Sequence, residues 1–171
     1  MFKNLACAAL LSISGVLASS KKLLEDPLPL NITFDTHTWN GYLSVTQSKN
    51  LHYMLVESAG DTNNDPLLIW FNGGPGCSSM LGMFQENGPW VIDDDTHSIY
   101  KNPHSWNARA NVLYLESPAG VGFSYGSDSD LYHNDISQSE DAWVALQQFH
   151  ELFPEYKSRD LYISGESYGG I

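Results

Sequence analysis

Asp160-Leu161-Tyr162-Ile163-Ser164 runs directly into Gly165-Glu166-Ser167-Tyr168-Gly169. The first five residues are largely apolar and have polar neighbours, as expected of a short buried strand. The G-x-S-x-G pattern that follows is typical of a tight turn from a strand into a helix, where glycines are needed because neighbouring backbone passes too close for a Cβ. Such a turn lifts the serine hydroxyl clear of the sheet, so Ser167 is a candidate nucleophile. Taken alone, the pattern fits an ordinary glycine-containing turn equally well.

A second strand and loop could supply backbone donors around this serine. Leu67-Leu68-Ile69-Trp70-Phe71 is an apolar run typical of a buried strand, and Asn72-Gly73-Gly74-Pro75-Gly76-Cys77-Ser78-Ser79 follows it directly. A glycine-rich loop in this place can turn its N–H groups toward a developing negative charge. The N–H of Tyr168 would be the second donor. Together the two motifs favour an α/β-hydrolase arrangement.

Other segments complete the expected sheet. Residues 39–45 and 51–57 alternate apolar and polar side chains on either side of a turn, and they predict a hairpin at the edge of the sheet. Residues 111–115 predict a further buried strand, and residues 78–85 a short helix. The result is a mixed sheet that becomes parallel toward Ser167.

A long helix is expected before the last strand. Ser137 and Glu140 fit a capping box at its start, and Pro154 ends the run. Its apolar stripe, which we expect to pack against the sheet, consists of Ile136, Trp143, Leu146, Phe149 and Phe153.

Four blocks of sequence resemble the serine carboxypeptidases, in the order in which that family carries them: residues 70–79, 86–89, 111–125 and 165–170. The resemblance covers about Thr36 to Ile171. It implies an α/β-hydrolase fold with a mixed, mostly parallel central sheet flanked by helices. Because it looks like the N-terminal part of a family member, we expect the domain to be truncated after the turn that carries Ser167.

The resemblance implies a role for each matching position. Ser167 matches the nucleophile, and the N–H groups of Gly74 and Tyr168 match the oxyanion hole. Cys77 matches a cysteine that the family pairs with a partner far downstream. The sequence has no His/Cys cluster with metal-ligand spacing and no phosphate-binding loop, so we expect no metal and no cofactor. The positions that match the family's site for the C-terminal carboxylate of the substrate are Trp70, Asn72, Gly73, Glu86 and Glu166.

Glu86 and Glu166 also carry a pH prediction. If the two carboxyl groups face each other in a closed pocket, they share a proton and can hydrogen-bond a terminal carboxylate at acidic pH. As the pH rises, activity on peptides should fall before activity on esters or amides that lack a free carboxylate. The alternative is a pair of solvated surface glutamates.

The catalytic base is not evident in these residues. An α/β-hydrolase triad runs Ser, acid, His along the chain, whereas all six histidines precede Ser167. We interpret them as surface or loop histidines: His37, His52, His97, His104, His133 and His150. Without a base the serine is a poor nucleophile, so we expect these 171 residues alone not to turn over peptides.

Three hypotheses for function stay open. The leading one is a serine-type carboxypeptidase that releases residues from peptide and protein C-termini through an acyl-enzyme on Ser167. A same-family acyltransferase would pass the acyl group to an alcohol instead. A truncated, non-catalytic secreted product would bind a peptide or partner chain without chemistry. A generic lipase or esterase fits less well, because paired glutamates are an odd lining for an apolar acyl chain.

The composition excludes one class of partner. The chain has 8 Lys and Arg against 20 Asp and Glu, a formal net charge of −12. Nucleic acid is therefore an unsuitable partner, because neutralising phosphates requires clustered basic residues.

The N-terminus predicts entry into the secretory pathway. Residues 1–18 have a slightly positive start, an apolar stretch and small residues placed for cleavage, as in a signal peptide. The stretch is too short for a membrane-spanning helix, so we expect no membrane anchor and an extracellular, lysosomal or vacuolar destination. Residues 19–35 would be an extended lead-in and residues 36–171 the carboxypeptidase-like domain. Asn31 begins a sequon for N-glycosylation, and Cys77 would be the sole mature cysteine.

Overall fold

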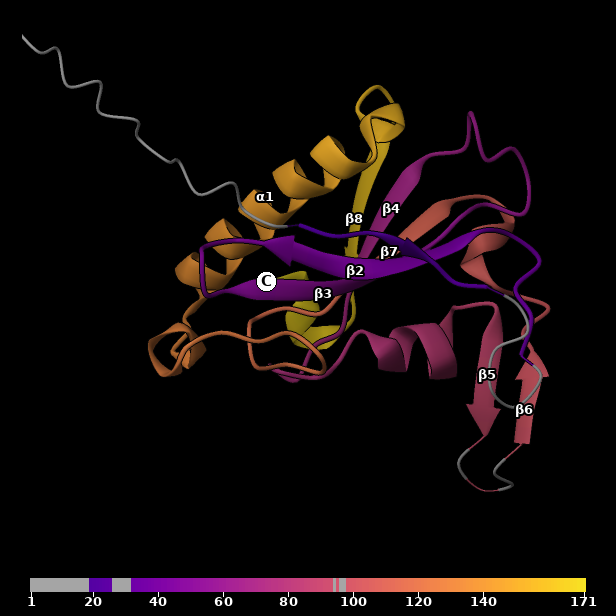
Figure 1. Ribbon diagram of the computed structural model, residues 1–171. Helices are drawn as coiled ribbons and strands as arrows, with labels where there is room; N and C mark the ends of the chain where they lie inside the picture. The colour runs from indigo at the N-terminus through magenta and orange to yellow at the C-terminus, as the bar shows by residue number, and fades with distance from the viewer. Residues whose placement is uncertain (1–18, 26–31, 94, 96–97) are drawn as a thin grey trace, which may run out of the picture.

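The computed structural model describes residues 19–25, 32–93, 95 and 98–171 (Figure 1). The predicted signal peptide and the sequon at Asn31 lie outside these residues. A six-stranded sheet in the described chain has the order β1-β2-β3-β7-β4-β8. Its strands are β1 (Lys22–Leu23), β2 (Thr38–Ser44), β3 (Asn50–Val56), β4 (Leu67–Phe71), β7 (Asn111–Leu115) and β8 (Leu161–Gly165).

The direction of the strands changes across this sheet. The pairs from β1 to β7 are antiparallel, whereas β4 pairs in parallel with both β7 and β8. This is the predicted mixed sheet that turns parallel toward Ser167. A separate hairpin of β5 (Trp90–Asp93) and β6 (Ser98–Lys101), which the sequence analysis did not predict, projects from the lower corner of the molecule in Figure 1.

The helical segments connect these strands. The longest is α1 (Asp135–Leu152), and a π-helix at Gly82–Glu86 confirms the short helix predicted after β4. Single 3₁₀ turns are formed by Trp106–Ala108, Asp128–Leu131, Pro154–Tyr156 and Ser167–Gly170. In the described part of the chain, none of the helices is both long and apolar enough to cross a bilayer.

The predicted hairpin forms, but its edge position is wrong. The lead-in supplies β1, which covers β2, and the Ser20 N–H donates to the Tyr42 carbonyl at 2.8 Å. Lys21 then reaches α1, where its Nζ donates to the Leu152 carbonyl at 2.7 Å and lies 4.5 Å from the ring centre of Phe153. The apparently extended segment is therefore an anchored outer strand.

The strand before Ser167 was expected to be buried, and this prediction is wrong. Leu161, Tyr162 and Ile163 are 41%, 55% and 68% exposed. The reason is position: β8 is the last strand of the described sheet and pairs only with β4. An apolar run indicates a strand but does not say which of its faces another layer covers.

Helix α1 begins earlier than its expected cap. Asn134 is the N-cap, its side chain accepting from the Ser137 N–H at 2.9 Å, so the capping box is Asn134 and Ser137 and not Ser137 and Glu140. The predicted stripe is buried only in its second half. Ile136 and Trp143 are 70% and 60% exposed, and a cavity lies between this part of the helix and strand β8.

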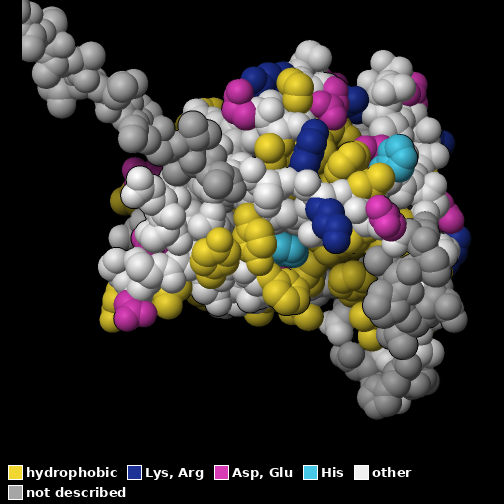
Figure 2. All heavy atoms as spheres, viewed as in Figure 1, with side chains coloured by type: hydrophobic (Ala, Val, Ile, Leu, Met, Phe, Trp, Pro, Cys, Tyr) yellow, Lys and Arg dark blue, Asp and Glu magenta, His cyan; other side chains and the backbone are white. Residues whose placement is uncertain are grey.

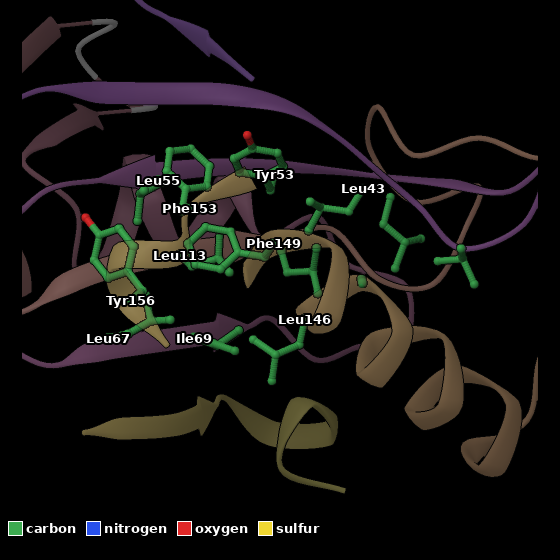
Figure 3. Close-up of a cluster of buried hydrophobic side chains, with 14 of the residues drawn as sticks. Leu43, Tyr53, Leu55, Leu67, Ile69, Leu113, Leu146, Phe149, Phe153 and Tyr156 are labelled. Carbon is green, nitrogen blue, oxygen red and sulfur yellow. The ribbon is translucent and has the colours of Figure 1, made fainter. Parts of the chain in front are cut away.

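The core is divided by the sheet into two clusters. On the α1 side, the rings of Phe149 and Phe153 are stacked with their centres 4.9 Å apart. The ring of Tyr53, from β3, meets both of them edge to face (Figure 3). Met83 of the π-helix packs on the other side together with Tyr114 and Trp70. All residues of β3 are buried, as expected for a strand covered on both faces.

Replacement of one core ring gives a test of this packing. Phe149 is 0% exposed, so Phe149→Ala should lower the free energy of unfolding by about 3–5 kcal/mol through lost burial and the cavity left behind. Trp143→Ala, on the same helix, is the matched control and should cost about 0.5 kcal/mol or less. Urea unfolding measures both. Equal effects of the two changes would contradict the placement of α1.

Candidate active site

The parallel pairing of β4 and β8 brings the two predicted motifs to one edge of the sheet. In the register of this pair Phe71 is opposite Gly165, the last residue of each strand. The Glu166 N–H continues the pairing and donates to the Phe71 carbonyl at 3.1 Å. The loop that begins at Asn72 and the turn that begins at Glu166 therefore leave the sheet side by side.

Ser167 occupies a strained backbone conformation. Its φ is 53°, and it is the one non-glycine residue with positive φ in the described part of the chain. This left-handed region costs a non-glycine residue about 1–2 kcal/mol. The turn closes with the Gly169 N–H donating to the Glu166 carbonyl at 2.9 Å, and the Ser167 residue is exposed. The predicted tight turn with an accessible serine is what the structure contains.

The glycine-rich loop touches this turn through its backbone. A Cβ placed on Gly73 would lie 2.6 Å from the Glu166 carbonyl oxygen, 2.7 Å from the Tyr168 nitrogen and 3.0 Å from the Ser167 Cβ. Gly74 follows with φ of 109°, and its N–H donates no hydrogen bond within the described residues. The two predicted oxyanion donors therefore belong to segments in direct contact.

Three of the predicted carboxylate-binding residues form a hydrogen-bonded chain. Trp70 Nε1 donates to Asn72 Oδ1 at 2.8 Å, and Asn72 Nδ2 donates to Glu86 Oε1 at 2.7 Å. The Gly82 N–H also donates to Asn72 Oδ1, at 3.0 Å. Trp70 and Asn72 are buried, whereas Glu86, the last residue of the π-helix, is exposed. Hydrogen bonds from Trp70 and Gly82 fix the side-chain amide of Asn72, and this amide orients the exposed carboxyl group of Glu86.

Glu166 lies on the turn beside this chain. Its side chain is exposed and makes no hydrogen bond or ion pair among the described residues. Since Glu86 is exposed as well, the closed pocket around the two carboxyl groups is not formed by the described residues. Their shared proton remains a prediction.

A cavity adjoins the turn. A cavity of about 410 Å³ is bounded by α1, β4, β8 and the end of the chain. Gly73 and Tyr168 contribute to its wall, but Ser167 and the two glutamates do not. Its lining is mainly apolar and includes Phe71, Trp143, Leu146 and Ile163. The cavity therefore adjoins the predicted site through Asn72, Gly73 and Tyr168, and the exposed side chains of β8 and of the start of α1 form its apolar wall.

The loop and the turn each carry one further side chain of interest, Cys77 and Tyr168. Cys77 is an exposed free thiol in the described residues, in the loop after Gly74. Tyr168 donates from its hydroxyl to Asp135 Oδ1 at 2.8 Å, which ties the turn to the first turn of α1. Hydrogen bonding to the Asp135 carboxylate, together with its charge, raises the pKa of the Tyr168 hydroxyl.

The sequence analysis missed a buried polar cluster behind the glycine-rich loop. Glu116, directly after β7, is 0% exposed. Its carboxylate accepts hydrogen bonds from His52 Nδ1 at 2.9 Å, from the Phe123 N–H at 2.9 Å, and from Ser78 Oγ. His52 is thus a buried residue of β3, and its interpretation as a surface or loop histidine is wrong. A charged residue directly after the apolar residues 112–115 was the available signal.

These contacts set the charge state of Glu116. Burial alone would raise the pKa of this carboxyl group, but the hydrogen bonds from His52, Ser78 and the Phe123 N–H, with the charge that His52 can carry, hold it below its ordinary value. A carboxyl group with a lowered pKa stabilises the fold above its ordinary pKa. That contribution is lost as the pH falls through the lowered value.

Comparisons with known proteins agree on one family. The family described as serine carboxypeptidase matches residues 28–171. The chain is 50% identical over 133 residues to the lysosomal protective protein of Mus musculus, covering 78% of this chain and 28% of that protein. It is 49% identical over 161 residues to serine carboxypeptidase ctsa-4.1 of Caenorhabditis elegans, covering 94% of this chain and 34% of that protein.

A solved structure is similar as well. The crystal structure of Kex1(delta)p, a prohormone-processing carboxypeptidase from Saccharomyces cerevisiae, superposes with a TM-score of 0.70 at 26% identity, covering 79% of this chain and 32% of that one. The chain thus spans between 28% and 34% of the length of these relatives.

Two adjacent glycines test how closely the turn packs. A Cβ on Gly169 would collide with the Phe71 carbonyl group, whereas a Cβ on Gly170 meets nothing within 4 Å. Gly169→Ala should therefore lower the free energy of unfolding by about 1–3 kcal/mol, as overpacking does. Gly170→Ala should be neutral or stabilise by up to about 1 kcal/mol. Chemical denaturation decides, and a Gly169→Ala variant as stable as the wild type would refute the contact.

Proposed function

The chain belongs to the serine carboxypeptidase family, and from this premise we propose that the protein that carries it releases C-terminal residues from peptides through an acyl-enzyme on Ser167. The observation that carries the proposal is the contact of the glycine-rich loop with the strained turn at Ser167. It supports a nucleophile and two backbone donors acting on one carbonyl group. Backbone strain of this kind is concentrated at functional sites.

The proposed reaction has two steps. Ser167 Oγ attacks the carbonyl carbon of the last peptide bond, its proton passes through a base to the leaving nitrogen, and the C–N bond breaks. Water then adds to the ester, and the new acid leaves with regeneration of the hydroxyl. The N–H groups of Gly74 and Tyr168 would stabilise the negative oxygen in both steps. In the order Ser, acid, His, the base belongs after Ser167 and hence outside these 171 residues.

Restriction to C-termini would come from the polar chain beside the nucleophile. Asn72 is held from both sides by Trp70 and Glu86, which fixes its amide near the strand end that carries the glycine-rich loop. A free carboxylate could hydrogen-bond there with Gly73 and with protonated Glu86 or Glu166. Peptide and protein C-termini are the proposed substrates, because an internal peptide segment offers no such group.

We also propose passage through the secretory pathway to a lysosomal, vacuolar or extracellular site. Support comes from the signal-like residues 1–18, the sequon at Asn31, and the name of the lysosomal protective protein that the chain resembles. The acidic composition suits such a compartment.

The role of Ser167 as nucleophile can be tested in the protein that carries this chain, expressed in the form in which it naturally occurs. Wild type should react covalently with a fluorophosphonate probe and release single residues from a peptide C-terminus. Ser167→Ala should abolish labelling and lower kcat at least about 1,000-fold, because the attacking oxygen is removed. Mass spectrometry of the labelled protein identifies the residue. Labelling with transfer to an added alcohol but no hydrolysis would replace the peptidase by an acyltransferase, and no labelling would support a non-catalytic product.

The two glutamates give a separate pH test. In wild type, hydrolysis of a peptide should decline with rising pH before hydrolysis of an ester that lacks a free carboxylate, because ionised carboxyl groups repel the peptide terminus. The double change Glu86→Gln and Glu166→Gln should remove this difference between the two pH profiles. Glu155→Gln, at an exposed position after α1, is the control. A peptide profile that keeps its alkaline decline in the double variant would refute the role of the pair.

A further inference from the structure

Glu116 joins three segments that are distant in the sequence. His52 belongs to β3, Ser78 to the glycine-rich loop, and the Phe123 N–H to the loop after β7. Each donates to the carboxylate of Glu116. The Ser124 hydroxyl donates to the Glu116 backbone carbonyl at 2.7 Å. A buried carboxylate with several donors is a rigid junction, because any displaced donor leaves an unpaired charge in the interior.

Aromatic rings cover most of the outer side of the cluster, and His52 is 8% exposed. Tyr42 and Phe123 each meet the ring of His52 edge to face, with ring centres 5.5 Å and 5.2 Å away, and Tyr125 lies 5.2 Å from Tyr42. Figure 2 shows hydrophobic side chains gathered around a histidine on the face formed by β2 and β3. Among the described residues, His52 is the one titratable side chain that contacts Glu116.

The same junction fixes the C-terminal half of the glycine-rich loop. Beside Ser78, the Ser79 hydroxyl donates to the Leu115 carbonyl at 2.7 Å and accepts from the Asn72 N–H at 3.2 Å. The loop between them is closed by the Cys77 N–H, which donates to the Gly73 carbonyl at 3.0 Å. Gly73 and Gly74 therefore lie in a short bridge that is held at Asn72 and at Ser78.

We propose that Glu116 is a positioning residue for the oxyanion loop, holding Gly74 at the correct distance from Ser167 through its hydrogen bond with Ser78. This role rests on the proposed function. Glu116 does not touch substrate and belongs to none of the motifs assigned a role above. Its carboxylate reaches Gly74 only through the loop backbone.

The charge of the carboxylate matters most for the contact with Ser78. His52 Nδ1 and the Phe123 N–H both donate to Oε2, whereas the Ser78 hydroxyl donates to Oε1. In a glutamine of the same shape the oxygen can still accept from His52 and Phe123, and the NH₂ group faces the Ser78 hydroxyl, which can accept. Glu116→Gln therefore replaces the charge-assisted hydrogen bond from Ser78 with a weaker one between neutral groups, with little change in volume.

The expected kinetic effect is on kcat. A displaced oxyanion donor weakens an interaction made in the transition state, so kcat should fall about 10- to 100-fold while KM changes less than about threefold. Ser78→Ala should give a similar pattern, since it removes the link but leaves the carboxylate in place. The measurement is kcat and KM on a peptide substrate, for wild type and for each variant of the protein that carries this chain.

Asp141→Asn is the matched control. Asp141 is also a buried carboxylate, 8% exposed and paired with Lys49 at 2.8 Å, but it joins α1 to the turn after β2. It should lower stability without lowering kcat. A general loss of stability would instead reduce the activity of all three variants alike, and that outcome would overturn the proposal.

Hydrogen exchange adds a readout that needs no turnover. The amide of Cys77 should exchange about tenfold faster in Glu116→Gln and Ser78→Ala than in wild type, and at the wild-type rate in Asp141→Asn. Unchanged exchange or unchanged kcat in Glu116→Gln would overturn the positioning role while wild type remains active. An inactive wild type would refute the proposed function itself, a distinct result.

Discussion

The arrangement of the site depends on the parallel pairing of β4 with β8, extended by the close approach of Gly73 to the turn at Ser167. Parallel strands that end in register deliver both following loops to the same edge of the sheet. The remaining distance is closed only where side chains are absent. Gly73 and Gly169 face backbone from the opposing segment, so the two loops meet main chain to main chain. Such contact positions backbone N–H donors accurately, because their positions do not depend on side-chain rotamers.

The two halves of the site have different supports. The turn at Ser167 is attached to a strand that is largely exposed in the described structure, and Tyr168 adds one hydrogen bond to α1. The glycine-rich loop rests on buried groups, with Asn72 on one side and the Glu116 cluster on the other. Buried contacts of the core therefore set the position of the glycine-rich loop. The turn gains its definition from local geometry, mainly from the backbone of Ser167.

Local patterns predicted α1, the strands β2, β3, β4, β7 and β8, and the meeting of the two motifs at one edge of the sheet. Residues 67–71 and 111–115 form strands with the predicted bounds, because continuous apolar runs between polar segments have few other solutions. Burial could not be predicted in the same way. The exposure of Ile163 and Trp143 depends on which layers cover β8, and this is a property of the whole domain.

Features that depend on partners distant in the sequence were also missed. The N-cap at Asn134 was overlooked because Ser137 and Glu140 offered a second capping pattern in the same turn. The strand β1 has only two residues and is defined by what it pairs with. The burial of Glu116 and His52 arises from a contact between residues 64 positions apart, which a single sequence does not reveal. The motifs predicted the edge of the sheet that carries Ser167 and the glycine-rich loop, but not the buried contacts that hold this loop in place.

The anchoring of the outer strand also orders events during synthesis. Lys21 contacts the end of α1 across 131 positions of sequence, and Ser19 contacts Gln148 across 129. A chain made from its N-terminus must produce α1 before these residues can reach their partners, and closing so long a loop costs entropy. The segment that leaves the ribosome early is therefore among the last to settle. Until then, the outer edge of β2 is covered only by its short pairing with β1, without the support of α1.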